Sequence, residues 1–167
     1  MYAYKLAVAI KRAGYSNIRI YNGGLKEWIA SGNTVEVIDH LQEYTLPMID
    51  AAELLKKITA AKENGCTSVD GRPFLTLLDL RTERSQAGGN VPLNIASNCT
   101  TIEGVMDDLL DEQFRSNIPI DSPVYVITET GNRDRYVGRF LKKYGYTNIT
   151  GLIFGMRGWI KADYPTN

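Results

Sequence analysis

The sequence predicts an α/β fold: a domain with a central, mostly parallel sheet flanked by helices, preceded by a partial second copy of the same domain. Residues 74–80 (FLTLLDL) and 123–127 (PVYVI) are continuous apolar runs of strand length, the pattern of parallel strands that are covered on both faces. Segments with helical spacing separate these runs, and strands that alternate with helices are typical of a parallel sheet. An internal repeat predicts the second copy.

The repeat joins the two ends of the chain. Residues 11–29 (KRAGYSNIRIYNGGLKEWI) align without a gap with residues 142–160 (KKYGYTNITGLIFGMRGWI). The offset is 131 residues, because 159 − 28 and 145 − 14 both give 131. Matched glycines, tyrosines and tryptophans in one register indicate that the two segments have the same local structure.

Each copy is predicted to contain a helix, a short strand and a second helix. In the first copy, apolar spacing predicts a helix that ends at Gly14, a strand over residues 17–21 and a short helix after Gly24. In the second copy, the corresponding elements are a helix over about 135–144, a strand over 148–152 and a helix over 156–162.

Between the two copies, residues 33–47 read as a polar linker that ends in a proline. The segments that follow are predicted from their periodicity and polarity: a helix over 51–62, loops over 65–73 and 82–90, and a helix over 101–114. We therefore expect three parts: residues 1–32 as the carboxyl-terminal third of a first repeat, residues 33–47 as a linker, and residues 48–167 as a complete domain.

The composition of the chain argues against several classes of function. The 167 residues hold 19 Lys and Arg against 19 Asp and Glu, so the net charge is zero and nothing favours binding to nucleic acid or an anionic membrane. No apolar stretch approaches the ~20 residues of a membrane span. Two cysteines without a CxxC motif and a single His40 cannot complete a zinc site, and no cofactor is predicted. The simplest interpretation is a cytoplasmic protein with reduced thiols.

The second apolar strand is followed by a candidate anion-binding loop, which runs directly into a helix. Such a loop directs several backbone N–H groups inward and favours a bound anion. The residues concerned are Thr128, Glu129, Thr130, Gly131, Asn132 and Arg133.

This loop resembles that of the rhodanese family of sulfurtransferases, in which Cys-x-x-Gly-x-Arg-Ser/Thr follows a parallel strand. Gly131 and Arg133 match the pattern, as do the GYxN segment and the Gly…Trp tail of the second repeat copy. Upstream, Asp79 and Arg81 resemble the family's Asp-x-Arg element. They are followed by a match to Gly-His-Ile-Pro in which Asn90 stands in place of the histidine. The resemblance covers about residues 48–165 and, with the repeat, implies a rhodanese of the tandem-domain type.

Thr128 departs from the family at the position of its cysteine nucleophile. Rhodanese chemistry needs a thiolate that takes sulfur as a persulfide, and a hydroxyl cannot form one. Glu129 adds a negative charge to the loop. The resemblance therefore implies a catalytically inactive module with a structural or interaction role and no catalytic residue at Thr128. The same substitution argues against the cysteine-dependent phosphatases that are related to the family.

An alternative is a sulfurtransferase whose nucleophile lies in a missing upstream half-domain or is Cys99. Cys99 is predicted just ahead of a helix, whose N-terminus would activate a thiol, although an inert thiol is the simpler interpretation. Cys66 is predicted to be an exposed loop thiol. For Arg133, binding an anion and pairing with Glu129 or Asp134 are both open. For Asp79 and Arg81, a structural ion pair is favoured over catalysis.

The first copy begins inside its own loop, because 128 − 131 gives −3. Residues 1–32 thus lack the earlier strands of a rhodanese-like unit and cannot close a sheet, so their apolar face must pack on something. We expect one of three arrangements. The chain is part of a longer tandem protein whose upstream half-domain covers this face, or residues 1–32 dock on the complete domain, or they dock on a second chain.

Overall fold

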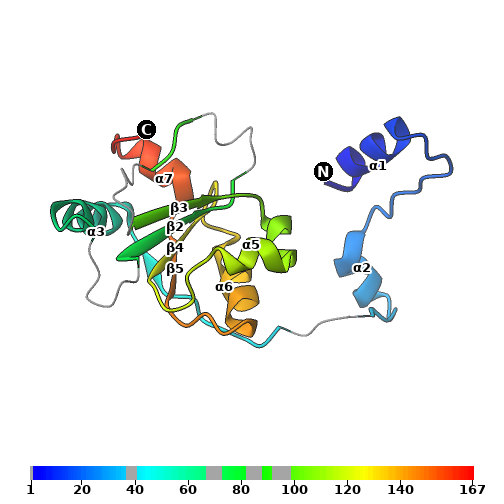
Figure 1. The fold of residues 1–167 in the computed structure, drawn as a ribbon. Coiled ribbons are helices and arrows are strands. Elements are labelled where there is room, and N and C mark those ends of the chain that lie inside the picture. Colours follow the sequence, from blue (N-terminus) through cyan, green and yellow to red (C-terminus); the bar gives the residue numbers. More distant parts are fainter. Residues whose placement is uncertain (1, 37–40, 67–72, 82–87, 92–98) are drawn as a thin grey trace. The chain divides into compact units, whose positions relative to one another are not determined.

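The computed structural model describes residues 2–36, 41–66, 73–81, 88–91 and 99–167. The chain divides into two compact units, Met1–His40 and Leu41–Asn167 (Figure 1). No helix in these ranges is long and apolar enough to cross a membrane.

The second unit contains a five-stranded sheet in the order β1-β5-β4-β2-β3, and every neighbouring pair of strands is parallel. This confirms the predicted α/β fold with a parallel sheet flanked by helices. The strands, in chain order, are β1 (Met48–Ile49), β2 (Leu75–Asp79), β3 (Cys99–Glu103), β4 (Val124–Ile127) and β5 (Ile149–Leu152).

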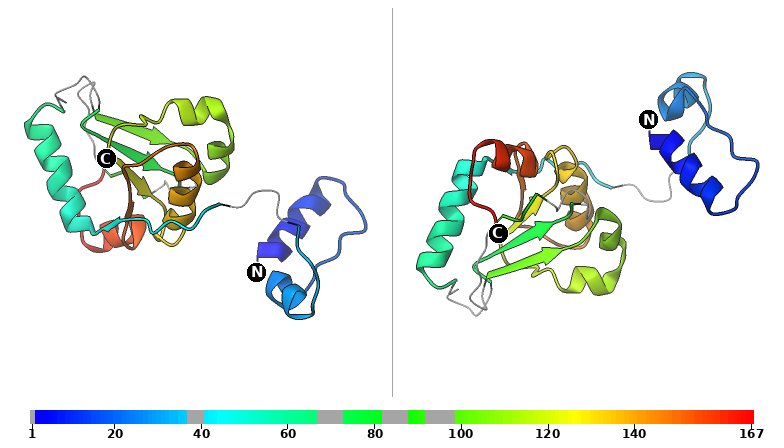
Figure 2. Two further views of the ribbon diagram at one scale, coloured as in Figure 1. Left: turned by 90° about the horizontal axis from the view of Figure 1, so that it is seen from below. Right: turned by 90° about the horizontal axis from the view of Figure 1, so that it is seen from above.

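Helices cover both faces of this sheet. On one face α3 and α7 pack, and on the other α5 and α6 (Figures 1 and 2). Because successive side chains of a strand point to opposite faces, β4 sends Tyr125 and Ile127 to the first core and Val124 and Val126 to the second. The helical elements of this unit are α3 (Ala51–Glu63), the 3₁₀ helix η1 (Met106–Leu110), α5 (Glu112–Ser116), α6 (Asp134–Lys143) and α7 (Gly155–Lys161).

The predicted helix over 101–114 is wrong in its first part. Residues Cys99–Glu103 form β3, which pairs along the whole of β2, and only then do η1 and α5 follow. Thr100, Thr101 and Ile102 are β-branched and favour a strand beside a neighbour that offers hydrogen bonds. The apolar spacing of the later residues is consistent with η1 and α5.

The last part of the predicted linker belongs to the core of the second unit. Leu46 is buried in the core beneath α6, and Tyr44 packs against the same core. The Pro47 carbonyl accepts a hydrogen bond from the Gly151 amide at 2.9 Å, which extends the pairing of β1 with β5.

The two cysteines correct a second prediction. Cys66 and Cys99 form a disulfide that links the turn after α3 to the start of β3, with their Cα atoms 5.3 Å apart. Both side chains are fully buried in the core between α3 and the sheet. The predicted reduced thiols and the exposed position of Cys66 are therefore wrong, and the argument from unpaired cysteines for a cytoplasmic location no longer applies.

The first unit contains two helices, α1 (Tyr2–Arg12) and α2 (Gly24–Ala30), at the positions that the repeat predicts. The predicted strand over residues 17–21 is not formed within the described residues; the segment between the helices has no regular secondary structure. A strand requires a neighbour to complete its backbone hydrogen bonds, and the described part of this unit supplies none.

Candidate functional site

The candidate loop lies at the carboxyl-terminal edge of the sheet. Asp79, the last residue of β2, pairs in register with Ile127, the last residue of β4, and the Leu80 amide donates to the Ile127 carbonyl at 2.9 Å. Thr128 and Arg81 thus follow adjacent strand ends. In open parallel sheets, this edge is where ligands bind.

The Thr128 hydroxyl is buried and forms two hydrogen bonds inside the loop. It donates to Asp134 Oδ1 at 2.5 Å and accepts from the Gly131 amide at 3.1 Å. These two bonds fold the loop back onto the start of α6. The hydroxyl is therefore a structural centre of the loop and not a group that projects towards solvent.

Asp134 is the acid that holds this arrangement. Its side chain is fully buried, and its Oδ2 accepts from the Leu152 amide at 2.9 Å, so one carboxyl group connects the loop to β5. Burial raises the pKa of Asp134 to about 6, and the hydrogen bonds from Thr128 and Leu152 limit the rise. Asp134 therefore changes its charge at a mildly acidic pH.

Two glycines allow the chain to pass close to itself here. Gly131 has φ +75°, and a Cβ added to it would lie 2.6 Å from the Leu152 carbonyl oxygen. Gly155 has φ +54°, and its added Cβ would lie 2.2 Å from the Thr128 carbonyl oxygen. Both positions need glycine for space as well as for conformation, so the loop and the start of α7 are packed backbone to backbone.

Glu129 and Arg133 do not form the pair that was considered for them. The Glu129 carboxylate accepts from Arg157 Nε at 3.1 Å, across to α7. Arg133 is the N-cap residue of α6 and is exposed, whereas Asp134 is bonded to Thr128. Arg133 thus makes neither of the ion pairs that the sequence left open for it, and its binding of an anion stays a prediction.

Two hollows flank the loop, and Asn132 lines both. One, of about 420 Å³, is bounded by the segment before β1 and by Arg135 and Arg139 of α6. The other, of about 750 Å³, is lined by Thr130, by Phe154 just before α7, and by Arg157 and Lys161 of α7.

Arg139, which lines the first hollow, has one unsatisfied donor that is buried. Arg139 pairs with Glu43 through Nη2, but its Nε is buried and has no hydrogen-bond partner among the described residues. Cationic side chains with a free N–H next to a helix-forming loop favour an anionic ligand. The loop amides of residues 129, 130, 132 and 133 likewise find no acceptor within the described part of the chain.

Asp79 and Arg81 form a buried ion pair, with Arg81 Nη2 2.6 Å from Asp79 Oδ2. The same nitrogen donates to the Gly89 carbonyl and to Asn90 Oδ1, and Asn90 in turn donates to Glu103 Oε1 at 2.7 Å. The pair therefore ties the end of β2 to the segment around Asn90 and to β3. Pro92, the last residue of the upstream match, lies outside the described residues.

Cys99 lies far from the loop. It is paired in register with Leu75 at the start of β2, whereas Thr128 follows the strand end at Asp79 and Ile127. Four residues of strand separate the two ends, roughly 13 Å at ~3.3 Å per residue. Because Cys99 is also in a disulfide and precedes a strand and not a helix, it does not supply a free, activated thiol.

Sequence reasoning missed two residues of the site. The sequence indicates Asp134 only as a partner for Arg133, and it gives no role to Arg139. The six-residue spacing of Thr128 and Asp134 is a signal that was available, because a loop that turns back at Gly131 brings the two together. The role of Arg139 depends on residues 41–47, which read as linker, so no local signal was available for it.

Comparison with known proteins finds similarity to thiosulfate sulfurtransferases and to solved rhodanese-like structures. No protein-family model matches the chain. The thiosulfate sulfurtransferase GlpE of Haemophilus influenzae is 38% identical over 53 residues, which is 32% of this chain and 50% of that protein. The chain thus matches about half the length of this curated relative.

Two solved structures share the fold. A rhodanese-related protein from Thermoplasma volcanium aligns with a TM-score of 0.54 and 23% identity, over 72% of this chain and 97% of that protein. A protein from Rhodopseudomonas palustris, described as a possible tyrosine phosphatase, aligns with a TM-score of 0.52 and 14% identity, over 91% of this chain and all of that protein. The chain therefore has a rhodanese-like fold, and its similarity to thiosulfate sulfurtransferases supports a relationship to that family.

Proposed function

We propose that residues 41–167 are a rhodanese-like binding module that does not transfer sulfur. The observation that carries this proposal is the state of the Thr128 hydroxyl. It stands at the family's cysteine position and is buried, with both of its hydrogen bonds directed to Asp134 and Gly131. A group held in this way supports the loop, and its oxygen cannot accept sulfane sulfur.

The ligand that the surroundings favour is a small anion or an acidic side chain of a partner. Arg135 and Arg139 line the hollow on one side of the loop, and Arg133 is exposed at the start of α6. Glu129 weakens anion binding less than the sequence suggests, because its charge is paired with Arg157.

Intact mass after incubation with thiosulfate tests the proposal directly. In sulfur transfer, a thiolate attacks the outer sulfur of thiosulfate, the S–S bond of thiosulfate breaks and sulfite leaves, so the protein gains one sulfur atom. We expect no gain on the wild-type chain. A gain that peptide mapping places on Cys66 or Cys99 would overturn the proposal and favour the sulfurtransferase alternative.

A cysteine placed at position 128 tests whether the loop can still receive thiosulfate once a nucleophile is present. In Thr128→Cys alone, the Asp134 carboxylate lies beside the new thiol and raises its pKa, so we expect little sulfur uptake near pH 7. In Thr128→Cys/Asp134→Ser, which also restores the family's last loop residue, we expect one sulfur per chain. Thr128→Ser is the matched control and should stay unmodified. A double variant that takes up no sulfur would show that the loop does not receive thiosulfate.

A further inference from the structure

The first unit repeats the structure of the last third of the second unit as well as its sequence. Adding the offset of 131 to the bounds of α2 (Gly24–Ala30) gives the bounds of α7 (Gly155–Lys161). The glycines that end the preceding helices also agree, with φ +93° at Gly14 and +89° at Gly145.

The tryptophan of each copy makes the same long-range hydrogen bond. Trp28 Nε1 donates to the Thr34 carbonyl at 2.9 Å, and Trp159 Nε1 donates to the Pro165 carbonyl at 2.9 Å. Thr34 and Pro165 are also 131 residues apart. The described residues of the first unit are thus built like α6, β5 and α7 with the segment that follows them.

The copies differ in what covers them. Trp159 is fully buried, whereas Trp28 is 41% exposed; Tyr146 is 5% exposed, whereas Tyr15 is 67% exposed. Leu25 is 61% exposed, and its counterpart Met156 is buried. The first unit therefore presents, on its described surface, the apolar residue types that the second unit uses to build its core.

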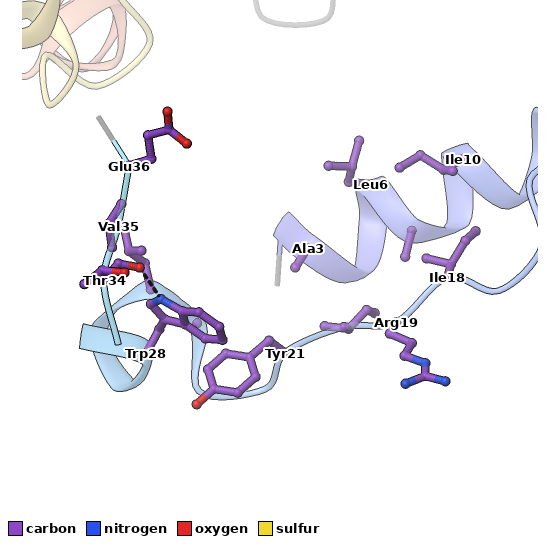
Figure 3. A pocket seen from close by; sticks show the side chains of 14 residues that line it. Ala3, Leu6, Ile10, Ile18, Arg19, Tyr21, Trp28, Thr34, Val35 and Glu36 are labelled. Atoms are coloured by element: carbon purple, nitrogen blue, oxygen red, sulfur yellow. Dashed lines mark hydrogen bonds between the residues drawn. The ribbon is translucent and has the colours of Figure 1, made fainter. Parts of the chain in front are cut away.

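Leu25 and Trp28 line a groove of about 580 Å³ in the first unit (Figure 3). Leu6, Ile10, Ile18 and Tyr21 line it as well. The Tyr21 and Trp28 rings meet edge to face, with centroids 5.8 Å apart. In the second unit, the counterpart helices α6 and α7 pack on cores that contain residues of the sheet.

The backbone of the first unit is unsatisfied at the same place. Residues 18–20 make no backbone hydrogen bond with any described residue. Their counterparts in β5 pair with β4 on one side and with β1 on the other, both in parallel. A backbone segment without hydrogen-bond partners next to an apolar groove favours a polypeptide that supplies strands, because side-chain packing alone would leave these N–H and C=O groups unpaired.

We propose that this surface of the first unit docks a partner polypeptide that supplies a parallel strand to each edge of residues 18–21, in the way that β4 and β1 flank β5. The partner presents apolar side chains on both faces of those strands. The proposed occupant is a separate polypeptide, and coverage of this surface by residues 41–167 or by a second copy is an outcome that the test below would detect. This inference does not rest on the proposed function of the loop.

The native chain gives the first test. Hydrogen exchange should find the amides of residues 18–21 unprotected, acrylamide should quench Trp28, and sedimentation should find a monomer. Trp28→Phe assigns the quenching to Trp28 and not to Trp159. Protection of residues 18–21 in a dimer would show that a second copy covers the surface, and protection in a monomer would show that residues 41–167 do. Either result would overturn the proposal.

The second test uses a fusion protein that supplies two strands to the first unit. Residues 45–131 of this chain are joined ahead of Met1, because Asn132 is the counterpart of Met1, so that β1 and β4 precede the first unit in the order of the second. We expect exchange at residues 18–21 to slow by at least about tenfold, the change that ~1.4 kcal/mol of local stability produces. Quenching of Trp28 should fall towards that of Trp159.

The matched control is the same fusion with Val126→Pro in the added segment only, which removes a backbone N–H from its β4 and disrupts the strand. We expect this control to behave like the native chain. A fusion in which residues 18–21 stay unprotected and Trp28 stays quenchable would overturn the proposal, as would equal protection in the fusion and in the proline control.

Discussion

At the scale of single residues, Asp134 and Thr128 determine the conformation of the loop. A carboxyl group that is fully buried, and that accepts from a hydroxyl and a backbone amide, fixes the distance between the loop and β5. Desolvation makes the charged form of this group costly, which is why its pKa lies above that of an ordinary aspartate. Both the shape and the pH response of the loop follow from this one side chain.

The raised pKa of Asp134 predicts that stability falls as the pH rises through the acidic range. Below pH 3.8, the folded and unfolded states are both protonated at this residue. Between pH 3.8 and about 6, the unfolded state ionises first, so the contribution of neutral Asp134 is lost progressively and is gone above the folded pKa. The loss is on the order of 1–3 kcal/mol.

Urea unfolding of the wild type and of Asp134→Asn at pH 4, 5, 6 and 7 measures this effect. Other carboxylates titrate in both proteins and cancel in the difference between them. We expect the wild type to lose stability relative to Asp134→Asn as the pH rises, most steeply between 4 and 6. A difference that is constant with pH would contradict the shifted pKa.

Substitution of Gly131 should lower stability through a steric clash as well as through backbone strain, and a control glycine separates the two causes. In Gly131→Ala, the new Cβ meets the Leu152 carbonyl oxygen and the backbone is strained, so we expect a loss of about 2–4 kcal/mol of unfolding free energy. Gly145→Ala is the matched control: its φ is +89°, but its Cβ would only touch the Ile120 side chain at 3.4 Å. The control should cost about 1–2 kcal/mol by the same urea measurement. Equal losses would contradict the close packing of the loop.

At the scale of elements, the disulfide joins two segments that the sheet alone does not connect. It links the end of α3 to the start of β3 and closes a loop with a sequence separation of 33 residues. We expect Cys66→Ala/Cys99→Ala to lose about 2–4 kcal/mol of unfolding free energy. The wild type should become less stable in a reducing agent, whereas the double variant should not respond. A wild type that ignores the reductant would contradict a structural role for the bond.

Most elements of the second unit could be predicted from the sequence, because their signals are local. The apolar runs of β2 and β4 and the glycine that ends α6 lie within the elements that they predict. β3 was missed because its β-branched residues are followed by an apolar spacing that suits a helix. The disulfide was missed because nothing near either cysteine indicates its partner 33 residues away.

At the scale of the whole molecule, the two units should be separable in stability. Both hydrophobic cores consist of residues from Leu41–Asn167 only. We therefore expect removal of residues 1–40 to change the unfolding free energy of the second unit by less than about 0.5 kcal/mol. Thermal and urea unfolding, followed by the fluorescence of Trp159, measure this change.

Removal of residues 1–47 is the comparison that tests where the second unit begins. This deletion also removes buried Leu46 and the carbonyl of Pro47 that pairs with Gly151. We expect it to cost about 2–5 kcal/mol. Equal stability of the two truncated chains would place the start of the unit at residue 48, as the polar composition of residues 33–47 predicts.

The tryptophan hydrogen bond that recurs in both copies shows which part of this fold is determined by local sequence. The same indole reaches the same carbonyl in a copy where the ring is buried and in a copy where it is exposed. The helix and the turn that follows it thus form in both copies whether or not the tryptophan is covered, whereas the strand before the helix forms only where neighbouring strands pair with it. A helix and turn with this autonomy can be duplicated, moved and joined to new neighbours without being redesigned, and only the surfaces that meet those neighbours need to change.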